Sequence, residues 1–190
     1  MKTALALLLG FVIVGQVQAQ NAPAAQHLPR GTATDISNAE ILATVQKTAA
    51  APVSDQQIRV VSVNGEYNVG VGVVHRAKTE GRDIGFGIEH SQITEIYHVI
   101  SGNGTFVTGG TIENMKETPD NSPVVTTLNG PSSGGGKVVG GQSRNIGPGD
   151  VVIIPPHTPH WFTEITSDQI VYLVVRVDPH KVLPAGYGTK

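Results

Sequence analysis

The sequence contains no cysteine, and it is poor in charged residues. Without thiols the chain forms no disulfides, performs no thiolate catalysis and builds no cysteine-ligated zinc or iron–sulfur site. Charged residues make up only 15% of the 190 residues, with 13 lysines and arginines against 15 aspartates and glutamates. That balance excludes a highly charged disordered chain. Because the basic residues form no cluster, we expect no nucleic-acid partner.

Long hydrophobic runs are also missing, apart from one at the N-terminus. Residues 1–19 begin with Lys2, continue with the apolar run Ala4–Val14 and end in the small-residue pattern Val17–Ala19. This order is typical of a cleaved secretory signal peptide. The apolar run is short for a bilayer core of ~30 Å, so an uncleaved anchor is the weaker alternative. We therefore expect a periplasmic or secreted protein with no membrane contact after cleavage.

Glycine and proline, in contrast, are abundant, with 23 and 12 residues respectively. Their spread along the chain favours many turns between short strands rather than long helices. The length suits one domain of ordinary size. We expect a flexible leader over residues 20–34, a folded domain over residues 35–180 and a short tail over residues 181–190.

One helix is predicted, and only strands follow it. Ser37 and Glu40 have the spacing of a capping box, which predicts a helix over Asn38–Ala49. Beyond it the pattern has a period of two, and Asn64-Gly65 marks a hairpin turn. The predicted strands are Ile58–Val63, Tyr67–His75, Asp83–His90, Thr94–Ile100, Thr105–Val107, Val151–Ile154, His160–Ile165 and Gln169–Val177. This order indicates an all-β sandwich or small barrel.

The segment over residues 109–146 is rich in Gly, Ser, Pro and Asn and separates the two halves of the predicted strand set. Long loops in compact domains are either mobile surface segments or functional lids. A mobile excursion is the favoured interpretation, and a lid over a site is the alternative. Within it, Val124–Leu128 and Lys137–Val139 are two candidate short strands.

Most of the histidines lie in or near two segments of the predicted strands. In the first segment His90 ends one strand, Glu95 begins the next and Gly102 lies at the following turn. In the second, a Gly-Asp pair precedes the apolar strand Val151–Ile154, and prolines then lead to His160, just before an aromatic residue. Together, in this order, the two segments resemble the paired motifs of the cupin superfamily.

The resemblance covers residues 58–177 and implies an all-β fold, a cupin-like β-barrel or jelly roll, preceded here by one short helix. In cupins the first motif usually carries two histidines two residues apart, and this sequence has Ile88 at the first of those positions. The metal-ligand set that the resemblance implies is therefore reduced to His90, Glu95 and His160.

Two neutral imidazoles and one carboxylate suit Fe(II) and also accept Mn, Ni, Cu or Zn. We expect one divalent metal ion, whose identity the sequence leaves open. The alternative is a metal-free barrel in which His90 and Glu95 are hydrogen-bonded partners. The metal is favoured because an inward carboxylate without a cation or donor is costly to bury.

Other histidines are weaker ligand candidates. His98 lies three residues after Glu95, and an odd separation on a strand turns the two side chains to opposite faces. His75 lies on the strand before the first motif, where a hydrogen-bonded core or surface role is more common. His157 lies in a proline-rich turn and is expected to be solvated.

The same alternation predicts the lining of a mostly apolar pocket around the metal. Phe86 and Ile88, together with Ile84, share a face with His90; Tyr97 shares one with Glu95; and Phe162 shares one with His160. Tyr97 contributes the one polar group of this lining and is a weak candidate for a catalytic residue.

Three large side chains on the strands have no role in that pocket. Trp161, the only tryptophan, is expected to face away and to pack on the helix or on a partner subunit. Arg76 and Arg176 lie on apolar strands, where an arginine needs an anionic partner or a path to solvent. Paired structural roles are favoured over a substrate clamp.

Two functions remain open at this point. The first is an exported metal-dependent cupin enzyme acting on a small organic molecule, with dioxygenase chemistry slightly ahead of lyase or isomerase chemistry. The second is a non-catalytic cupin that binds a small molecule or a carbohydrate. The fold cannot choose the reaction. A homodimer is expected from the family resemblance alone.

Overall fold

The computed structural model describes residue 31, residues 33–82 and residues 84–188. The predicted signal peptide over residues 1–19 lies outside the described residues, and so does the leader apart from residues 31, 33 and 34. Within the described part of the chain, none of the helices has the length and apolar character needed to cross a bilayer.

Helix α1 (Asn38–Lys47) confirms the predicted helix and ends two residues before the predicted Ala49. The backbone N–H of Glu40 donates to the Ser37 hydroxyl at 3.2 Å, so Ser37 caps the helix as expected. Ile41 is buried in a cluster with Ile58, Val73 and Val171 from the neighbouring sheet. The helix therefore covers part of one sheet face.

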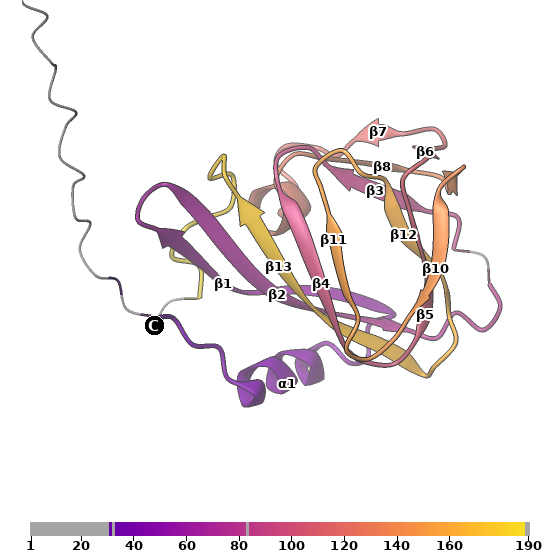
Figure 1. The fold of residues 1–190 in the computed structure, drawn as a ribbon, viewed down its shortest axis with the longest axis horizontal. Coiled ribbons are helices and arrows are strands. Elements are labelled where there is room, and N and C mark those ends of the chain that lie inside the picture. Colours follow the sequence, from indigo (N-terminus) through magenta and orange to yellow (C-terminus); the bar gives the residue numbers. More distant parts are fainter. Residues whose placement is uncertain (1–30, 32, 83, 189–190) are drawn as a thin grey trace, which may run out of the picture. The chain divides into compact units, whose positions relative to one another are not determined.

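The first sheet contains five antiparallel strands in the order β1-β2-β13-β4-β11 (Figure 1). Asn64 and Gly65 both adopt positive φ in the turn between β1 and β2, as this hairpin signal predicts. The first strand begins at Val53 rather than at the predicted Ile58. The five strands are β1 (Val53–Val63), β2 (Tyr67–Ala77), β13 (Gln169–Asp178), β4 (Thr94–Ser101) and β11 (Val151–Ile154).

The second sheet contains six strands in the order β10-β5-β12-β3-β8-β7, and β6 and β9 form a separate pair. These are β10 (Gln142–Ile146), β5 (Gly104–Thr108), β12 (His160–Ile165), β3 (Gly87–His90), β8 (Ser132–Gly135), β7 (Lys116–Glu117), β6 (Thr111–Ile112) and β9 (Val138–Val139). The all-β class with one preceding helix is therefore confirmed.

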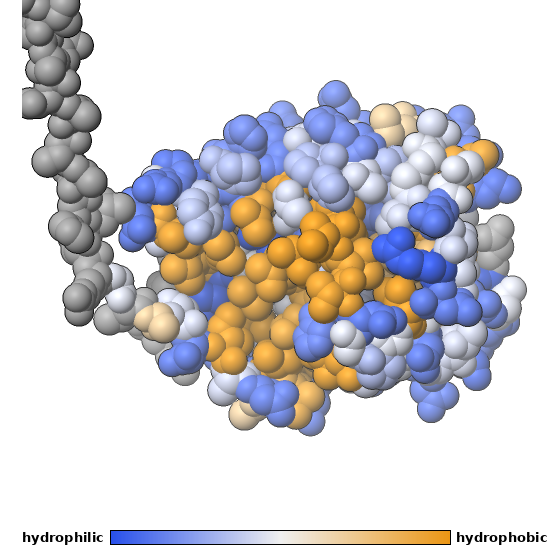
Figure 2. All heavy atoms as spheres, viewed as in Figure 1, coloured by the Kyte–Doolittle hydropathy of each residue, from blue (hydrophilic) through white to orange (hydrophobic). Residues whose placement is uncertain are grey.

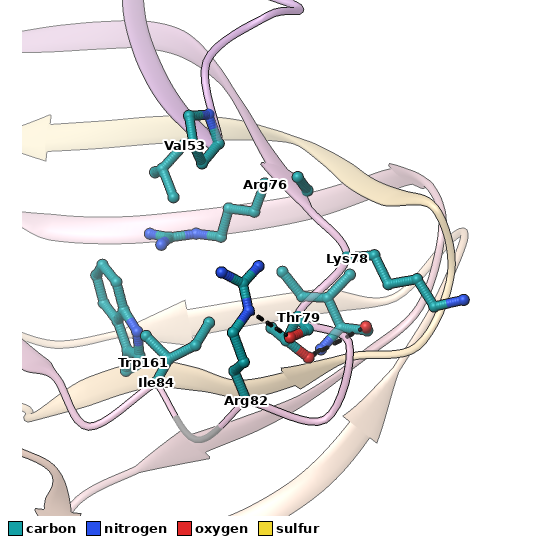
Figure 3. A pocket seen from close by; sticks show the side chains of 10 residues that line it. Val53, Arg76, Lys78, Thr79, Arg82, Ile84 and Trp161 are labelled. Carbon is teal, nitrogen blue, oxygen red and sulfur yellow. Dashed lines mark hydrogen bonds between the residues drawn. The ribbon is translucent and has the colours of Figure 1, made fainter.

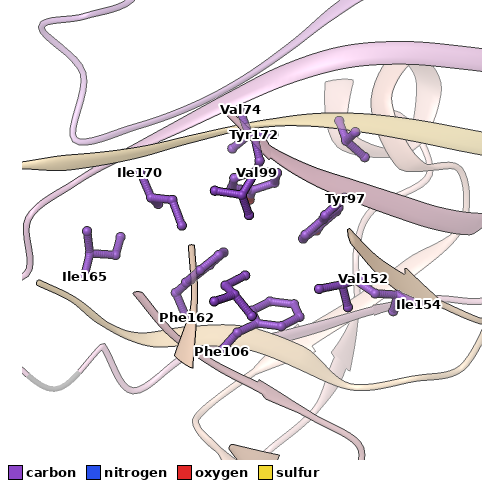
Figure 4. Packing of buried hydrophobic residues seen from close by; sticks show 12 residues of the cluster. Val74, Tyr97, Val99, Phe106, Val152, Ile154, Phe162, Ile165, Ile170 and Tyr172 are labelled. Atoms are coloured by element: carbon purple, nitrogen blue, oxygen red, sulfur yellow. The ribbon is translucent and has the colours of Figure 1, made fainter. Parts of the chain in front are cut away.

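The hydrophobic core lies between the two sheets (Figure 4). Phe106 and Phe162 from the second sheet and Tyr172 from the first are each 0% exposed. Their rings pack together, with centroids 4.7 Å apart for Phe106–Phe162 and 5.6 Å apart for Phe162–Tyr172. Full burial of one such aromatic side chain contributes about 1.5–3 kcal/mol to stability.

The outer face of the first sheet is only partly covered by α1. Figure 2 shows apolar residues gathered over this sheet. On the edge strand β11, Val151 and Ile153 are 59% and 64% exposed. Contiguous apolar surface of this kind marks an interaction site more often than isolated exposed residues do.

The segment over residues 109–146 is not the loose excursion that its composition favoured. β8 pairs with β3, and β10 pairs with β5, so this segment supplies strands to the second sheet. The predicted strand Val124–Leu128 is wrong, because Val124–Asn129 form a π-helical turn. The predicted strand Lys137–Val139 is present in shortened form as β9, which pairs with β6.

Two further boundaries differ from the prediction. Asp83 lies outside the described residues, and of the rest of the predicted strand Asp83–His90 only β3 is a strand, because the Phe86 N–H donates to the Ile84 carbonyl at 2.7 Å and bends the chain before Gly87. The described part of the tail over residues 181–190 is docked: Leu183 is buried, and Val60 exchanges backbone hydrogen bonds with Gly186 and Tyr187.

Candidate metal centre

Three side chains that lie far apart in the sequence meet between the two sheets. His90 ends β3 and His160 begins β12, while Glu95 belongs to β4 in the facing sheet. His160 pairs with Ile88 across the strands, so His160 and His90 share the inward face of the second sheet. Their exposed fractions are 4% for His90 and 2% each for Glu95 and His160. One candidate ligand atom from each residue lies within 4.8 Å of the other two.

The hydrogen bonds behind the two imidazoles fix the positions of their protons. Ser132 donates its hydroxyl hydrogen to the Gly130 carbonyl at 2.8 Å, so its oxygen accepts from His90 Nδ1–H at 2.8 Å. His160 Nδ1 lies 2.9 Å from the Thr158 carbonyl, which only accepts. Both neutral rings therefore carry their proton on Nδ1 and present the Nε2 lone pair to the interior.

These two lone pairs face the same carboxylate oxygen. His90 Nε2 and His160 Nε2 each lie 3.4 Å from Glu95 Oε2. With both Nδ1 atoms protonated, no proton of a neutral imidazole lies between the rings and the carboxylate. Three electron-pair donors that converge in a buried space attract a cation.

Glu95 also accepts hydrogen bonds from a residue of its own strand and from one on the neighbouring strand β13. Arg176, directly opposite on β13, donates through Nε to Oε1 at 3.1 Å, and the Tyr97 hydroxyl donates to Oε2 at 3.0 Å. Arg176 also donates to Gln57 Oε1 at 2.8 Å and forms an ion pair with Asp55. One guanidinium thus serves two carboxylates, which leaves the network one positive charge short.

A glycine makes room for this network. A Cβ at Gly72 would lie 3.1 Å from Arg176 Nη1, closer than ordinary packing allows. The glycines within the strand that follows the first hairpin thus mark a place where a large side chain crosses close to the backbone.

Charge and burial act on these groups in opposite directions. Burial alone would raise the pKa of Glu95, but positively charged neighbours hold that pKa well below its usual range: His90 when its ring is protonated, and Arg176 in every state. Burial lowers the pKa of His90, and the charge of Glu95 opposes this only in part. Burial and the charge of Glu95 raise the pKa of Tyr97 well above its usual range. The site therefore combines an ionised carboxylate with a phenol that keeps its proton.

The residues present fit a divalent metal ion. The donor set is two nitrogen atoms and one carboxylate oxygen, and the second hydrogen bond of each imidazole orients its ring, as in known metal sites. The position of the usual first histidine is occupied by Ile88, whose side chain shares the strand face of His90 and adds no ligand. A bound ion would keep coordination positions for other molecules.

Three of the predicted pocket residues lie in two different settings. Tyr97 and Phe162 are buried inside the core, and the Tyr97 ring lies 6.2 Å from that of His160. Phe86 lies elsewhere: its ring is 37% exposed and packs edge-on against Trp161 at 4.6 Å. Its expected alternation with Ile88 fails because the chain bends before β3.

The three other histidines that were weighed as ligands lie outside the cluster. His98 is exposed on β4 and points outward, as its parity predicts. His75 is buried, but it shares the strand face of Val73, which packs under α1. The His157 side chain is 69% exposed, with Nδ1 4.0 Å from the Glu89 carboxylate.

Sequence reasoning missed two supporting residues. Ser132 comes from the segment that composition marked as a loop, and nothing in its local sequence distinguishes it. Arg176 was recognised only as an arginine in need of an anionic partner. The available signal was its position in the strand alternation, which turns its side chain towards the interior of an apolar strand. The identity of its partners could not be predicted, because it depends on which strands are neighbours.

Comparisons with known proteins give fold similarity only. No family model matches the sequence, and the search of curated proteins gives no match. A Bacillus halodurans protein covers 82% of this chain and 88% of its own, at 14% identity and a TM-score of 0.47. A cupin protein from Bacteroides fragilis covers 64% and 75%, at 16% identity and a TM-score of 0.37. The DMSP lyase of Ruegeria pomeroyi covers 73% of this chain and 54% of its own, at 17% identity and a TM-score of 0.42.

The arrangement of this chain's own motifs agrees with its sequence resemblance. One short helix precedes two antiparallel sheets with a shared core. The first motif occupies β3 and β4, the second occupies β11 and β12, and their three polar side chains converge in the interior. The chain has a cupin-type fold.

Proposed function

We propose that this protein is a metal-dependent enzyme that acts on a small organic molecule and holds one divalent ion with His90, Glu95 and His160. The observation that supports this most directly is the pair of Nε2 lone pairs directed at one buried carboxylate oxygen. In a metal-free interior this arrangement would leave three acceptors facing one another, which is costly. A cation satisfies all three.

The surrounding residues hold the site in one state. Arg176 keeps Glu95 ionised and fixes its orientation, while Ser132 and the Thr158 carbonyl fix the two rings. When bound, the ion supplies a Lewis acid for a substrate oxygen or, as iron or copper, a redox centre for oxygen-dependent chemistry. Apolar neighbours such as Phe162 exclude water from the interior.

Oxygen-using chemistry is favoured slightly over lyase or isomerase chemistry, because the latter two need a base. Tyr97 is the nearest candidate base, but its raised pKa and its hydrogen bond to Glu95 make it a donor at neutral pH. A positioning role for Tyr97 is better supported than a role in proton abstraction.

Metal content of the purified protein tests the proposal. We expect close to one divalent ion per chain after dialysis, and a loss of at least tenfold in His90→Ala and Glu95→Gln. His98→Ala, which removes an exposed histidine on the same strand as Glu95, serves as the matched control and should retain the metal. Far-ultraviolet circular dichroism establishes that each variant is folded. A folded parent that takes up none of Fe, Mn, Ni, Cu or Zn would instead support the non-catalytic binding protein.

We also propose that the protein is exported and forms a homodimer. The N-terminal residue of protein recovered from the periplasm or medium tests cleavage after residue 19. Light scattering of the same material gives the oligomeric state. The exposed apolar face over β11 supports an interface there, so Ile153→Lys should shift a dimer towards monomer.

A further inference from the structure

A pocket lies apart from the metal centre, where the end of β2 and the connection to β3 meet β12 (Figure 3). Its volume is about 290 Å³, near the lower end of pockets that bind small organic molecules. None of its lining residues belongs to the His90–Glu95–His160 cluster. The lining combines apolar side chains (Val53, Ile84, Ile165 and Trp161) with three cations (Arg76, Lys78 and Arg82).

Arg76 shows the clearest sign of a missing partner. Its Nε donates to the Tyr172 hydroxyl at 3.0 Å, and its guanidinium lies 4.0 Å from the centroid of a Trp161 ring. Among the described residues, neither of its two terminal amino groups has a hydrogen-bond or ion-pair partner. Arg176, on the neighbouring strand, has carboxylate or amide partners at Nε and at both terminal amino groups.

Arg82 adds a second guanidinium to the same space. Its Nε donates to the Thr79 carbonyl at 3.1 Å, and Figure 3 shows its terminal amino groups directed into the pocket beside Arg76. Within the described part of the chain, no carboxylate forms an ion pair with Arg76, Lys78 or Arg82. Arg76 is half-buried and Arg82 is exposed. Two guanidinium groups that face one pocket without an ion-paired anion repel each other.

Trp161 supplies an aromatic wall of the pocket. Its indole Nε1 is buried and has no acceptor among the described residues, but because this atom is shielded from solvent it is not a donor to a ligand in the pocket. The unpaired donors that the pocket gathers beside its apolar side chains are therefore the terminal amino groups of Arg76 and Arg82.

We propose that this pocket binds a small, flat organic anion with an acidic head and an apolar body. A carboxylate accepts from the terminal amino groups of Arg76 and Arg82, because the planar guanidinium matches carboxylate geometry. The apolar body lies against Trp161 and Ile84. The site is separate from the metal centre and does not require the metal.

Intrinsic fluorescence is a direct test, because Trp161 is the only tryptophan in the chain. The full mature chain is titrated with benzoate, with benzyl alcohol as the neutral analogue and inorganic phosphate as an anion without an apolar body. We expect a saturable change in emission with benzoate, and binding at least tenfold weaker for the other two. Calorimetry repeats the benzoate titration without an optical readout.

Two variants separate the pocket from other anion sites. Arg82→Gln should weaken benzoate binding at least tenfold, whereas Arg144→Gln, which removes a guanidinium near Phe106 outside the pocket, should leave it unchanged. Chelator-treated protein should bind benzoate as tightly as metal-loaded protein, which excludes binding to the metal.

Several results would overturn the proposal. The absence of saturable binding would mean that the chain itself satisfies the two guanidiniums. Equal affinity for phosphate and benzoate would show that the apolar body of the ligand contributes nothing to binding. Equal benzoate affinity of the parent and of Arg82→Gln would show that the anion binds elsewhere. Loss of benzoate binding on chelation would assign it to the metal centre.

Discussion

The metal centre and the Arg76 pocket place charged groups in two enclosed parts of the same domain, but they balance the charge differently. At the centre, Arg176 is shared between Glu95 and Asp55, so the surplus charge is negative. In the pocket, neither Arg76 nor Arg82 forms an ion pair with a carboxylate of the described residues, and no acidic residue lines the pocket, so the surplus charge of its lining is positive. The contrast teaches that the sign of the unpaired charge, rather than burial itself, decides whether a site selects a cation or an anion.

The largest effect is expected when Arg176 and Arg76 are replaced in turn and the losses of stability are compared. Arg176→Met leaves Glu95 and Asp55 without their cation, and breaking a buried pair in this way costs about 3–5 kcal/mol. Arg76→Met removes a cation that forms no ion pair among the described residues, so we expect a loss of about 1 kcal/mol, from its hydrogen bond to Tyr172. Urea denaturation of the metal-free proteins measures both. Equal losses in the two variants would contradict the charge balance described above.

A smaller effect, on metal affinity, is expected when the hydrogen-bond partner of the candidate ligand His90 is removed. Ser132→Ala takes away the acceptor of His90 Nδ1–H, and loss of such a partner typically weakens metal binding by about 10–100-fold. Ser133→Ala is the matched control, because it changes the adjacent residue of β8 and should leave metal affinity unchanged. Competition with a chromogenic chelator gives both affinities. If the two variants bind metal equally, the orientation of His90 does not depend on Ser132.

The smallest expected effect is a pH dependence that belongs to the metal centre alone. Because burial lowers the pKa of His90, the unfolded chain takes up a proton below the ordinary histidine value of 6.5 that the folded chain does not. The lowered pKa of Glu95 acts in the same direction below 4.5. Stability of the metal-free protein should therefore decrease as the pH falls from 7 to 4, by at most about 1.4 kcal/mol per pH unit for each group.

Two variants sharpen this pH test. His90→Gln should flatten the upper part of the profile, between pH 7 and 5. The stability of Arg76→Met should change with pH in parallel with that of the parent, since arginine does not titrate in this range. Thermal unfolding at each pH is the measurement. A parent profile that is flat from pH 7 to 5 would show that His90 takes up its proton equally in both states.

Much of the fold and the position of the central cluster could be predicted because they depend on local patterns. Alternation placed Glu95 and Tyr97 inward and His98 outward, and the motif order predicted that His90 and His160 would converge. The same rule failed for Phe86, because a bend at Ile84 interrupts the alternation that it assumes.

Other features could not be predicted because they depend on contacts that are distant in the sequence. Val124–Asn129 have the β-branched composition of a strand, but they form a π-helical turn in the connection between β7 and β8. The partners of Arg176 follow from the order β1-β2-β13-β4, which brings Asp55, Gln57 and Glu95 to one side chain. Local sequence does not encode that order.

The contact between Ser132 and His90 also has an evolutionary consequence. Gly130 has φ +63°, and a Cβ there would lie 2.5 Å from Val182 Cγ2, so this position admits only glycine. Its carbonyl accepts from Ser132, and the Pro131 carbonyl accepts from the backbone of Ser91 beside His90. We therefore expect relatives to retain residues 130–132 together. Insertions and deletions should accumulate on either side of this tripeptide, and a relative that lacks it should also lack the proposed metal site.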